Sequence, residues 1–376
     1  MRKINSELLT KNILENTKHD FENNKVFGSC YAVAQGDETI YKEYFGYTSV
    51  NAKTPVNSKT IFRLASMTKP ITTVATLILV ERGLLCLEDE ISKYIPDFKD
   101  IHVTEVIDDK LVDLGIAKNQ PTIFNILSHS AGIGSNSDKN KFLTSSDKEN
   151  SKTLSDFYVK IGLDYEPGTS QYYSGTGSFA VLGNIIEKIT GKSLQEFYSE
   201  EIFKPLKMND TTFIPTEEQW TRVIDMHGRV DGKNVVVAMN KNCGFVDYPC
   251  SHCVAGAGLF STLEDYLKFA RMLLNKGNFE DKTIVSETLI NMMSSPQVEI
   301  ESTTYWGLGV RVIRDGHPYL PKGSFGWSGA YGSHFWVNPL DNTVAVFMKN
   351  STVDGGAGNE SSRYFECAVK NSYINE

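Results

Sequence analysis

The chain has 376 residues, enough for one large domain or two closely packed domains with a substantial core. Its hydrophobic content of 40% and charged content of 22% are those of an ordinary soluble globular protein. The net charge of −8 argues against nucleic acid or an anionic membrane surface as a partner. Small molecules are therefore the expected ligands.

The N-terminus and the cysteines favour a cytoplasmic protein. The stretch Met1 to Glu7 leads directly into a charged amphipathic helix and lacks the apolar core of a signal peptide. The most apolar window, Ile71 to Leu87, is interrupted by polar residues such as Thr72 and Glu81, so no membrane span is expected. Six cysteines at irregular spacings do not suggest a disulfide framework. We expect a cytoplasmic protein with reduced thiols.

Hydrophobic periodicity and turn residues predict strands near both ends of the chain and helices between them. The N-terminal part is predicted to contain a helix, a strand pair and a second helix: Asn5 to Phe21, Phe27 to Gln35 with Thr39 to Tyr47, and Met67 to Arg82. The middle is predicted to be helical and rich in loops, with helices at Thr122 to Leu127, Leu154 to Leu163, Gly177 to Thr190 and Leu194 to Ile202. The C-terminal part is predicted to contain a helix, four strand segments and a last helix: Leu263 to Lys276, Tyr305 to Ile313, Gly323 to Trp327, Ser333 to Asn338, Thr343 to Lys349, and Glu360 to Lys370.

This order predicts an α/β (α+β) architecture. One antiparallel sheet is built from both ends of the chain and flanked by N- and C-terminal helices, with a mostly helical region inserted between them. We expect a discontinuous sheet domain, residues 1–83 and 254–376, and an inserted helical domain, residues 84–253. Because clefts between domains commonly bind small ligands, the site is expected where the two domains meet.

The stretch Ser66-Met67-Thr68-Lys69 is the strongest candidate for catalytic chemistry. Residues three apart on a helix share a face, so the Ser66 hydroxyl would lie beside the Lys69 amine. A helix N-terminus stabilises developing negative charge, and a serine becomes nucleophilic when a neighbouring base removes its proton. The simpler alternative is an ordinary helix start with Pro70 in its first turn. A second Ser-x-x-Lys, Ser145 to Lys148, lies in a polar stretch and is predicted to be a solvated loop.

Four further motifs follow Ser66 in the chain. They are Leu127-Ser128-His129-Ser130-Ala131-Gly132, Pro167-Gly168-Thr169 followed by Tyr172-Tyr173-Ser174-Gly175, Gly256-Ala257-Gly258-Leu259-Phe260-Ser261-Thr262, and Gly326-Trp327-Ser328-Gly329-Ala330. Their order and separation resemble the serine β-lactamase and penicillin-binding-protein superfamily. The resemblance is to the branch of class C β-lactamases, DD-peptidases and related carboxylesterases and acyltransferases. It covers about Phe27 to about Asn350 and implies a β-lactamase/transpeptidase-like fold.

The resemblance also implies roles for individual residues. Ser66 would be the nucleophile, Lys69 its basic partner and Tyr173 the second proton-transfer group. A lysine can act as a base when burial and nearby positive charge lower its pKa, and a tyrosine can carry the proton on to the leaving group. The implied substrate-binding strand comprises Trp327, Ser328 and Gly329, and the N–H of Ala330 would pair with that of Ser66 as an oxyanion hole.

Two positions depart from the β-lactamase pattern. Gly175 stands where the family's Tyr-x-Asn has an amide side chain, and Trp327 stands where Lys-Thr-Gly or His-Thr-Gly has a cation. A Trp-x-Gly is similar to the esterase and acyltransferase members. The site is therefore expected to accept less charged acyl substrates.

Each motif also has a structural interpretation. Tyr173 or Trp327, taken alone, would more often be a core residue, and His129 in Leu-x-His-x-x-Gly is expected to form a structural turn. Gly258 to Thr262 is predicted to be a turn that caps the helix from Leu263. Gly191 is predicted to end a helix rather than to open a phosphate-binding loop.

The only metal-like constellation is Cys243, Cys250, His252 and Cys253. Its spacing matches none of the usual zinc patterns, so structural cysteines are favoured. We expect no metal and no other cofactor.

The sequence thus predicts a serine hydrolase that forms an acyl-enzyme on Ser66, most simply a carboxylesterase or acyltransferase. A β-lactamase or D-amino-acid peptidase of the same fold is the first alternative. A non-catalytic, penicillin-binding-like sensor is the second, and the intact set of Ser66, Lys69 and Tyr173 argues against it.

Overall fold

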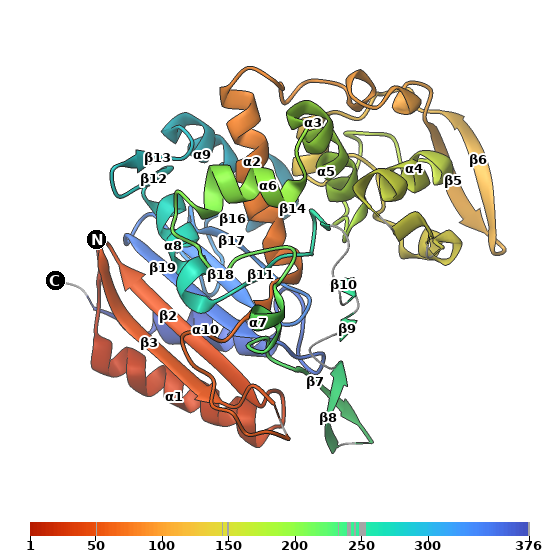
Figure 1. The fold of residues 1–376 in the computed structure, drawn as a ribbon. Coiled ribbons are helices and arrows are strands. Elements are labelled where there is room, and N and C mark those ends of the chain that lie inside the picture. Colours follow the sequence, from red (N-terminus) through yellow and green to blue (C-terminus); the bar gives the residue numbers. More distant parts are fainter. Residues whose placement is uncertain are drawn as a thin grey trace.

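An eight-stranded antiparallel sheet lies at the centre of the fold (Figure 1). In the computed structural model, the described residues are 1–374 apart from 50, 145, 149, 232, 239–241, 244–245 and 248–252. The strands follow the spatial order β14 (Val298–Glu301), β15 (Thr304–Trp306), β16 (Arg311–Ile313), β17 (Phe325–Ser328), β18 (His334–Asn338), β19 (Thr343–Lys349), β2 (Gly28–Gln35) and β3 (Glu38–Gly46). The prediction of one antiparallel sheet built from both ends of the chain is confirmed, because β2 pairs with β19.

Helices cover both faces of this sheet, and side chains alternate between the two faces along each central strand. Tyr31 and Val33 of β2 pack in one apolar cluster with α1 (Ser6–Glu22) and α10 (Glu360–Lys370). Cys30 and Ala32 pack in a second cluster on the opposite face, with α2 (Thr68–Glu81) and α8 (Leu263–Leu274). Both faces being buried explains why the central strands are apolar without interruption.

The remaining helices and short strand pairs complete the fold. The helices are α3 (Ile123–Leu127), α4 (Ser151–Ile161), α5 (Gly177–Thr190), α6 (Leu194–Tyr198), α7 (Glu217–Trp220) and α9 (Glu287–Met293). The strand pairs are β1 (Lys3–Ile4) with β20 (Tyr373–Ile374), β4 (Phe62–Arg63) with β11 (Phe260–Ser261), β5 (His102–Ile107) with β6 (Lys110–Ile116), β7 (Met226–Val230) with β8 (Lys233–Ala238), β9 (Asn242–Cys243) with β10 (Val246–Asp247), and β12 (Asn278–Phe279) with β13 (Lys282–Thr283).

Several predicted elements are confirmed with little change. The predicted helices Gly177–Thr190 and Glu360–Lys370 and the predicted strand Thr343–Lys349 have the same bounds in the structure. Gly191 ends α5 with a φ of 65°, the left-handed conformation that glycine adopts without a steric penalty. Thr262 caps α8, since its side chain accepts a hydrogen bond from the Asp265 N–H.

The predicted positions of the strands need correction in two parts of the chain. The single strand predicted from Tyr305 to Ile313 is wrong, because the chain turns back at Gly307 to Val310 and forms the pair β15 and β16. The Gly307 N–H donates to the Val310 carbonyl over 2.9 Å, and Gly309 has a φ of 65°. In the middle of the chain, the sequence analysis also missed the hairpin of β7 with β8 and, before it, the hairpin of β5 with β6. Asp108 and Asp109 form its turn, with φ of 48° and 61°.

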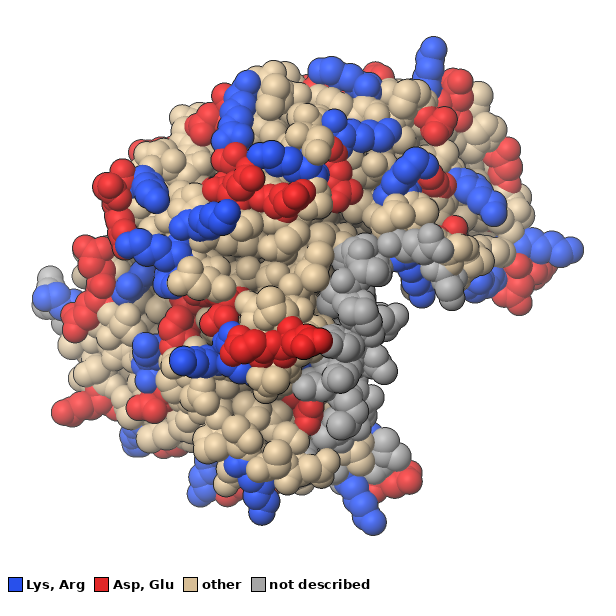
Figure 2. All heavy atoms as spheres, in the orientation of Figure 1, with Lys and Arg blue, Asp and Glu red and all other residues tan. Residues whose placement is uncertain are grey.

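On the face shown in Figure 2, positive and negative side chains are interspersed among the described residues. This distribution is the usual one for a water-exposed surface. Across the described part of the chain, no helix is both long and apolar enough to cross a membrane.

Candidate active site

Ser66 lies in a 3-10 turn, Ala65–Met67, that leads directly into α2. The turn is held from several sides: the Leu64 N–H donates to the Leu259 carbonyl over 2.8 Å, and the Tyr266 hydroxyl donates to the Met67 carbonyl over 2.9 Å. The predicted position of Ser66 at a helix start is confirmed.

The residue before Ser66 has an unusual backbone conformation. Ala65 is fully buried and has a φ of 45°, in the left-handed region that residues other than glycine seldom occupy. Such strain persists only where the surrounding structure imposes it, and it is frequent at active sites. Here it accompanies the turn that presents the Ser66 hydroxyl.

The Lys69 amine lies beside Ser66 and is fully buried. Its Nζ is 3.3 Å from the Ser66 Oγ, 2.6 Å from the Gly175 carbonyl and 3.0 Å from the Gly256 carbonyl. Burial lowers the pKa of Lys69, and interaction with the Tyr173 side chain raises it in part. In the neutral amine, two N–H groups satisfy the two carbonyls, which leaves the nitrogen lone pair for the Ser66 hydroxyl proton.

Tyr173 lies on the loop before α5, with its ring 4.8 Å from the Lys69 Nζ. The Trp327 Nε1 donates to the Tyr173 hydroxyl over 3.4 Å. Ser66, Lys69, Tyr173 and Trp327, which are widely separated in the sequence, therefore meet at one place.

A second tryptophan, which the sequence analysis did not single out, packs with Tyr173 and Trp327. We call the rings of Tyr173, Trp306 and Trp327 the aromatic wall. Trp306, at the end of β15, lies 5.9 Å from the Tyr173 ring and 4.9 Å from the Trp327 ring. Its Nε1 donates to the Gln171 Oε1 over 2.7 Å, which ties the sheet to the loop that carries Tyr173. The sequence signal that could have drawn attention to Trp306 is its position directly before Gly307, where the turn begins.

The end of β17 lies against the turn that carries Ser66. A Cβ added to Gly329 would come within 2.4 Å of the Leu64 carbonyl oxygen, so only glycine allows this approach. The Gly329 N–H donates to the Ser333 carbonyl over 2.8 Å. Ala330, predicted to supply the second oxyanion donor, follows Gly329 in the turn after β17.

Ser328 faces the other side of the sheet from Trp327. Its Oγ lies 2.8 Å from the His334 Nδ1, and the His334 Nε2 lies 3.0 Å from the Glu366 carboxylate on α10. Arg311 pairs with the same carboxylate over 3.1 Å. The Ser328 hydroxyl, predicted to contact substrate, is thus engaged behind the strand, where it belongs to a buried polar chain.

The buried polar chain of Ser328, His334 and Glu366 leads to a prediction for the stability of Glu366→Gln. Burial raises the pKa of Glu366, but the interactions with His334 and Arg311 outweigh it and bring the pKa below its usual value. A carboxylate whose pKa is lowered on folding stabilises the protein above its unfolded pKa and loses that effect as the pH falls through its folded pKa. Removing the charge leaves Arg311 and His334 inadequately paired, at a cost of about 3 kcal/mol.

Urea unfolding of the wild type and of Glu366→Gln should show this difference at pH 7 and a smaller one below about pH 4. The exposed Glu15→Gln is the matched control and should unfold like the wild type. Equal stability of the wild type and Glu366→Gln at pH 7 would show that the charge of Glu366 in the buried polar chain does not contribute to the free energy of unfolding.

Two other candidate features of the sequence are described only in part. Of the cysteine cluster, Cys253 is buried, whereas Cys250 and His252 fall outside the described residues. Lys148 of the second Ser-x-x-Lys is exposed, but it ends a short 3-10 helix, Ser146–Lys148, and does not lie in a loop.

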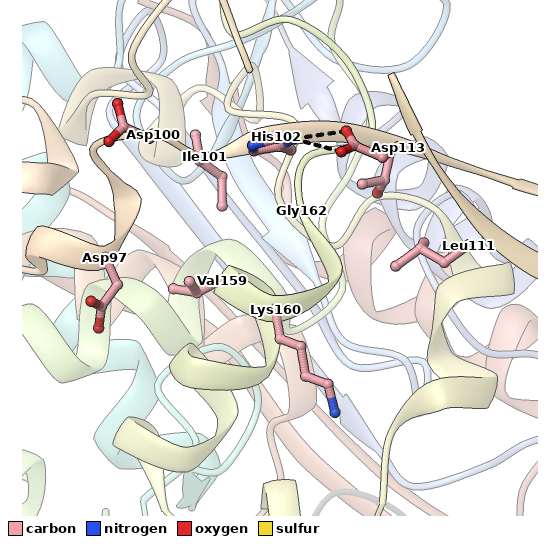
Figure 3. Close-up of a pocket in the computed structure, with 10 residues that line it drawn as sticks. Asp97, Asp100, Ile101, His102, Leu111, Asp113, Val159, Lys160 and Gly162 are labelled. Carbon is pink, nitrogen blue, oxygen red and sulfur yellow. Dashed lines mark hydrogen bonds and ion pairs between the residues drawn. The ribbon is translucent and has the colours of Figure 1, made fainter. Parts of the chain in front are cut away.

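A separate cavity of about 280 Å³ lies between the β5–β6 hairpin and α4 (Figure 3). His102 and Asp113, which form an exposed ion pair at 2.8 Å, stand on its wall, together with Asp97 and Asp100. None of the predicted site residues lines this cavity.

Comparison with known proteins places the chain and its fold in a family. The sequence matches the Beta-lactamase family over residues 14–365, and the chain belongs to that family, whose members are serine hydrolases. Esterase EstB of Burkholderia gladioli is 26% identical, over 89% of this chain and 88% of the relative. The N-acetylmuramyl-L-alanine amidase of Bacillus subtilis is 27% identical, over 86% of this chain and 77% of the relative. A solved structure described as EstCE1, a hydrolase with promiscuous acyltransferase activity, superimposes with a TM-score of 0.82 at 20% identity, covering 97% of this chain and 99% of that one.

Proposed function

We propose that the protein is a carboxylesterase or acyltransferase that forms an acyl-enzyme on Ser66 from small, uncharged acyl substrates. The observation that supports this most is the environment of the Lys69 amine, which is buried, bonded to two carbonyls and 3.3 Å from the Ser66 Oγ. An amine in this position is held ready to accept the serine proton.

In the first half of the reaction, the Ser66 Oγ attacks the ester carbonyl and its proton passes to the Lys69 amine. The carbonyl oxygen becomes an oxyanion, which the N–H groups of Ser66 and Ala330 would stabilise, each by about 3 kcal/mol. Tyr173 lies next to the Lys69 ammonium, donates its hydroxyl proton to the departing alkoxide and regains one from Lys69. The alcohol leaves and the acyl group remains on Ser66.

In the second half, water or an acceptor alcohol takes the place of the leaving group. Tyr173 and Lys69 remove its proton as it attacks the acyl carbonyl, and the Ser66 Oγ leaves with a proton from Lys69. Water gives hydrolysis and an alcohol gives acyl transfer. EstB is named an esterase, and EstCE1 is described as a hydrolase with promiscuous acyltransferase activity, so both outcomes have a precedent among similar proteins.

Two features of the site support an uncharged acyl group. Trp327, not a cation, stands next to Tyr173 at a ring distance of 5.2 Å, so it offers an apolar surface and one N–H. A Cβ added to Gly175 would meet no atom within 4 Å, so the glycine leaves open space beside Lys69. An ester with an apolar acyl chain fits such surroundings better than a substrate with a carboxylate that needs a cation.

The substrate preference tests this proposal. We expect p-nitrophenyl esters of short and medium acyl chains to be hydrolysed well, and the chromogenic cephalosporin nitrocefin to be at best a slow substrate. Mass spectrometry during turnover should find the acyl group on the peptide that contains Ser66. Hydrolysis of nitrocefin at ester-like rates would favour the amide-directed alternative, and failure of Ser66 to react with any ester, β-lactam or fluorophosphonate would favour the sensor.

The variant Gly175→Asn with Trp327→Lys tests which residues set this preference. The space beside Gly175 accommodates the new side chain, and the two changes add an amide and a cation as possible substrate contacts. We expect the ratio of nitrocefin to ester turnover to rise by roughly tenfold, the effect of one or two new polar contacts. Gly175→Ala, which adds a methyl group and no amide, is the matched control. An unchanged ratio would mean that other residues recognise the substrate.

A further inference from the structure

His129 is buried against the aromatic wall. Its ring lies 4.9 Å from the Tyr173 ring and 4.4 Å from the Trp306 ring. Its backbone is left-handed, with a φ of 55°. A histidine in this conformation at the base of a catalytic cluster calls for an explanation, because the proposed reaction gives it no proton to transfer.

The hydrogen bonds of His129 go to the two neighbours of Tyr173. The Tyr172 N–H donates to the His129 carbonyl over 3.2 Å, and the Ser174 N–H donates to the His129 Nδ1 over 3.3 Å. The same histidine therefore holds the main chain before and after Tyr173 and packs against its ring. The Tyr165 hydroxyl also donates to the His129 carbonyl, over 3.1 Å, which fixes the turn from another side.

We propose that His129 is a positioning residue that, as a hydrogen-bond acceptor at Nδ1, holds the Tyr173 hydroxyl in line with Lys69 and the leaving group. This inference rests on the proposed role of Tyr173 in proton transfer. The proposed role depends on one atom of the buried imidazole, Nδ1. It differs from the filling of space, which an apolar side chain of similar size could also provide.

The acceptor role requires a neutral ring, because both nitrogens of an imidazolium are donors. Burial, and then the nearby charge of Lys69, lower the pKa of His129 well below its usual value, so the ring stays neutral at physiological pH. With Nδ1 as acceptor, the ring proton sits on Nε2, which is buried without a hydrogen-bond partner in the described part of the structure. Among the described residues, the hydrogen bond of the ring is the one that Nδ1 accepts from the Ser174 N–H on the tyrosine loop.

Two amide side chains distinguish this role from simple filling of space. His129→Asn places an oxygen close to the position of Nδ1, and asparagine tolerates a positive φ better than most residues. His129→Gln places its oxygen further out, near the position of Nε2, and leaves the Ser174 N–H without its acceptor. Comparison of the two variants therefore isolates the acceptor atom.

The readout is the dependence of turnover on the leaving group. A p-nitrophenolate leaves without a proton, whereas an alkoxide needs one from Tyr173. We expect His129→Gln to lower kcat/KM, which reports only the half-reaction in which the alcohol leaves, by ~10²-fold for an alkyl ester, the range for loss of general-acid catalysis. The loss of kcat/KM for the p-nitrophenyl ester of the same acid should be smaller. His129→Asn should retain most of the wild-type kcat/KM for both esters.

The double variant His129→Gln with Tyr173→Phe should be no slower than Tyr173→Phe alone, because residues that act as a unit are not additive. Equal losses on both esters, an additive double variant, or an Asn variant as slow as the Gln variant would each overturn the positioning role. If His129→Gln does not fold, a ~10²-fold loss in a folded His129→Asn overturns it by itself. Wild-type rates in Tyr173→Phe would instead contradict the proposed function.

Discussion

Ser66→Ala is expected to abolish covalent labelling by a fluorophosphonate and to lower kcat/KM for p-nitrophenyl esters by ~10⁴-fold or more. The expectation follows from the loss of the Ser66 hydroxyl, which lies 3.3 Å from the Lys69 amine. No other group in the proposed reaction can hold the acyl chain covalently. Purified variant and wild type would be compared in steady-state assays and by intact-protein mass spectrometry after labelling.

The fold should survive this change, because the turn is held by the main chain and by Tyr266, whose hydroxyl donates to the Met67 carbonyl. Thermal unfolding should therefore be close to that of the wild type. The surface variant Ser146→Ala is a suitable control, since Ser146 is exposed and should matter for neither property. Ester hydrolysis by Ser66→Ala within tenfold of the wild type would remove Ser66 from the role of nucleophile.

The sheet could be predicted because its strands carry a simple signal. In β19, neighbouring side chains such as Val346 and Phe347 pack in different apolar clusters on opposite faces of the sheet. An uninterrupted run of apolar residues bounded by turns is therefore a signal of a strand that is buried on both faces. The β5–β6 hairpin carried a weaker signal, because its side chains are mostly exposed or half-buried and its turn uses Asp108 and Asp109 in place of glycine. Sequence patterning detects burial more readily than it detects an exposed hairpin.

The candidate site was predictable only where a motif marks it. Ser66, Lys69, Tyr173 and Trp327 each belong to such a motif, and the structure brings them together. The Gly175 and Gly256 carbonyls that hold Lys69 come from backbone, so no side chain marks them. Their contribution depends on distances across the fold, which a single sequence does not encode in any local pattern.

The orientation of Ser328 shows the same limit. A strand motif names three adjacent residues, but successive residues of a strand point to opposite faces. Trp327 faces Tyr173, and Ser328 faces His334. Which of the two faces carries the substrate is decided by the helices packed on each side, and these are set by long-range topology.

Lys69→Met is expected to lower kcat/KM for esters by ~10³-fold or more, since attack then starts from an unactivated hydroxyl. Methionine approximates the length of the lysine side chain and avoids the cost of burying an amine, so the variant should fold. Its main structural cost is that the Gly175 and Gly256 carbonyls lose their donor. The exposed Lys148→Met, from the second Ser-x-x-Lys, is the matched control and should keep full activity.

The pH dependence distinguishes a basic lysine from a merely structural one. Burial lowers the pKa of Lys69, so its amine becomes neutral at a lower pH than an exposed lysine would. Only the neutral amine can accept the Ser66 proton, so wild-type kcat/KM should rise with pH until it passes the folded pKa and then level off. The residual activity of Lys69→Met should lack that rise. A variant that keeps the wild-type pH profile at a reduced rate would place the titrating group elsewhere, and Lys69 would then hold the Gly175 and Gly256 carbonyls without serving as the base.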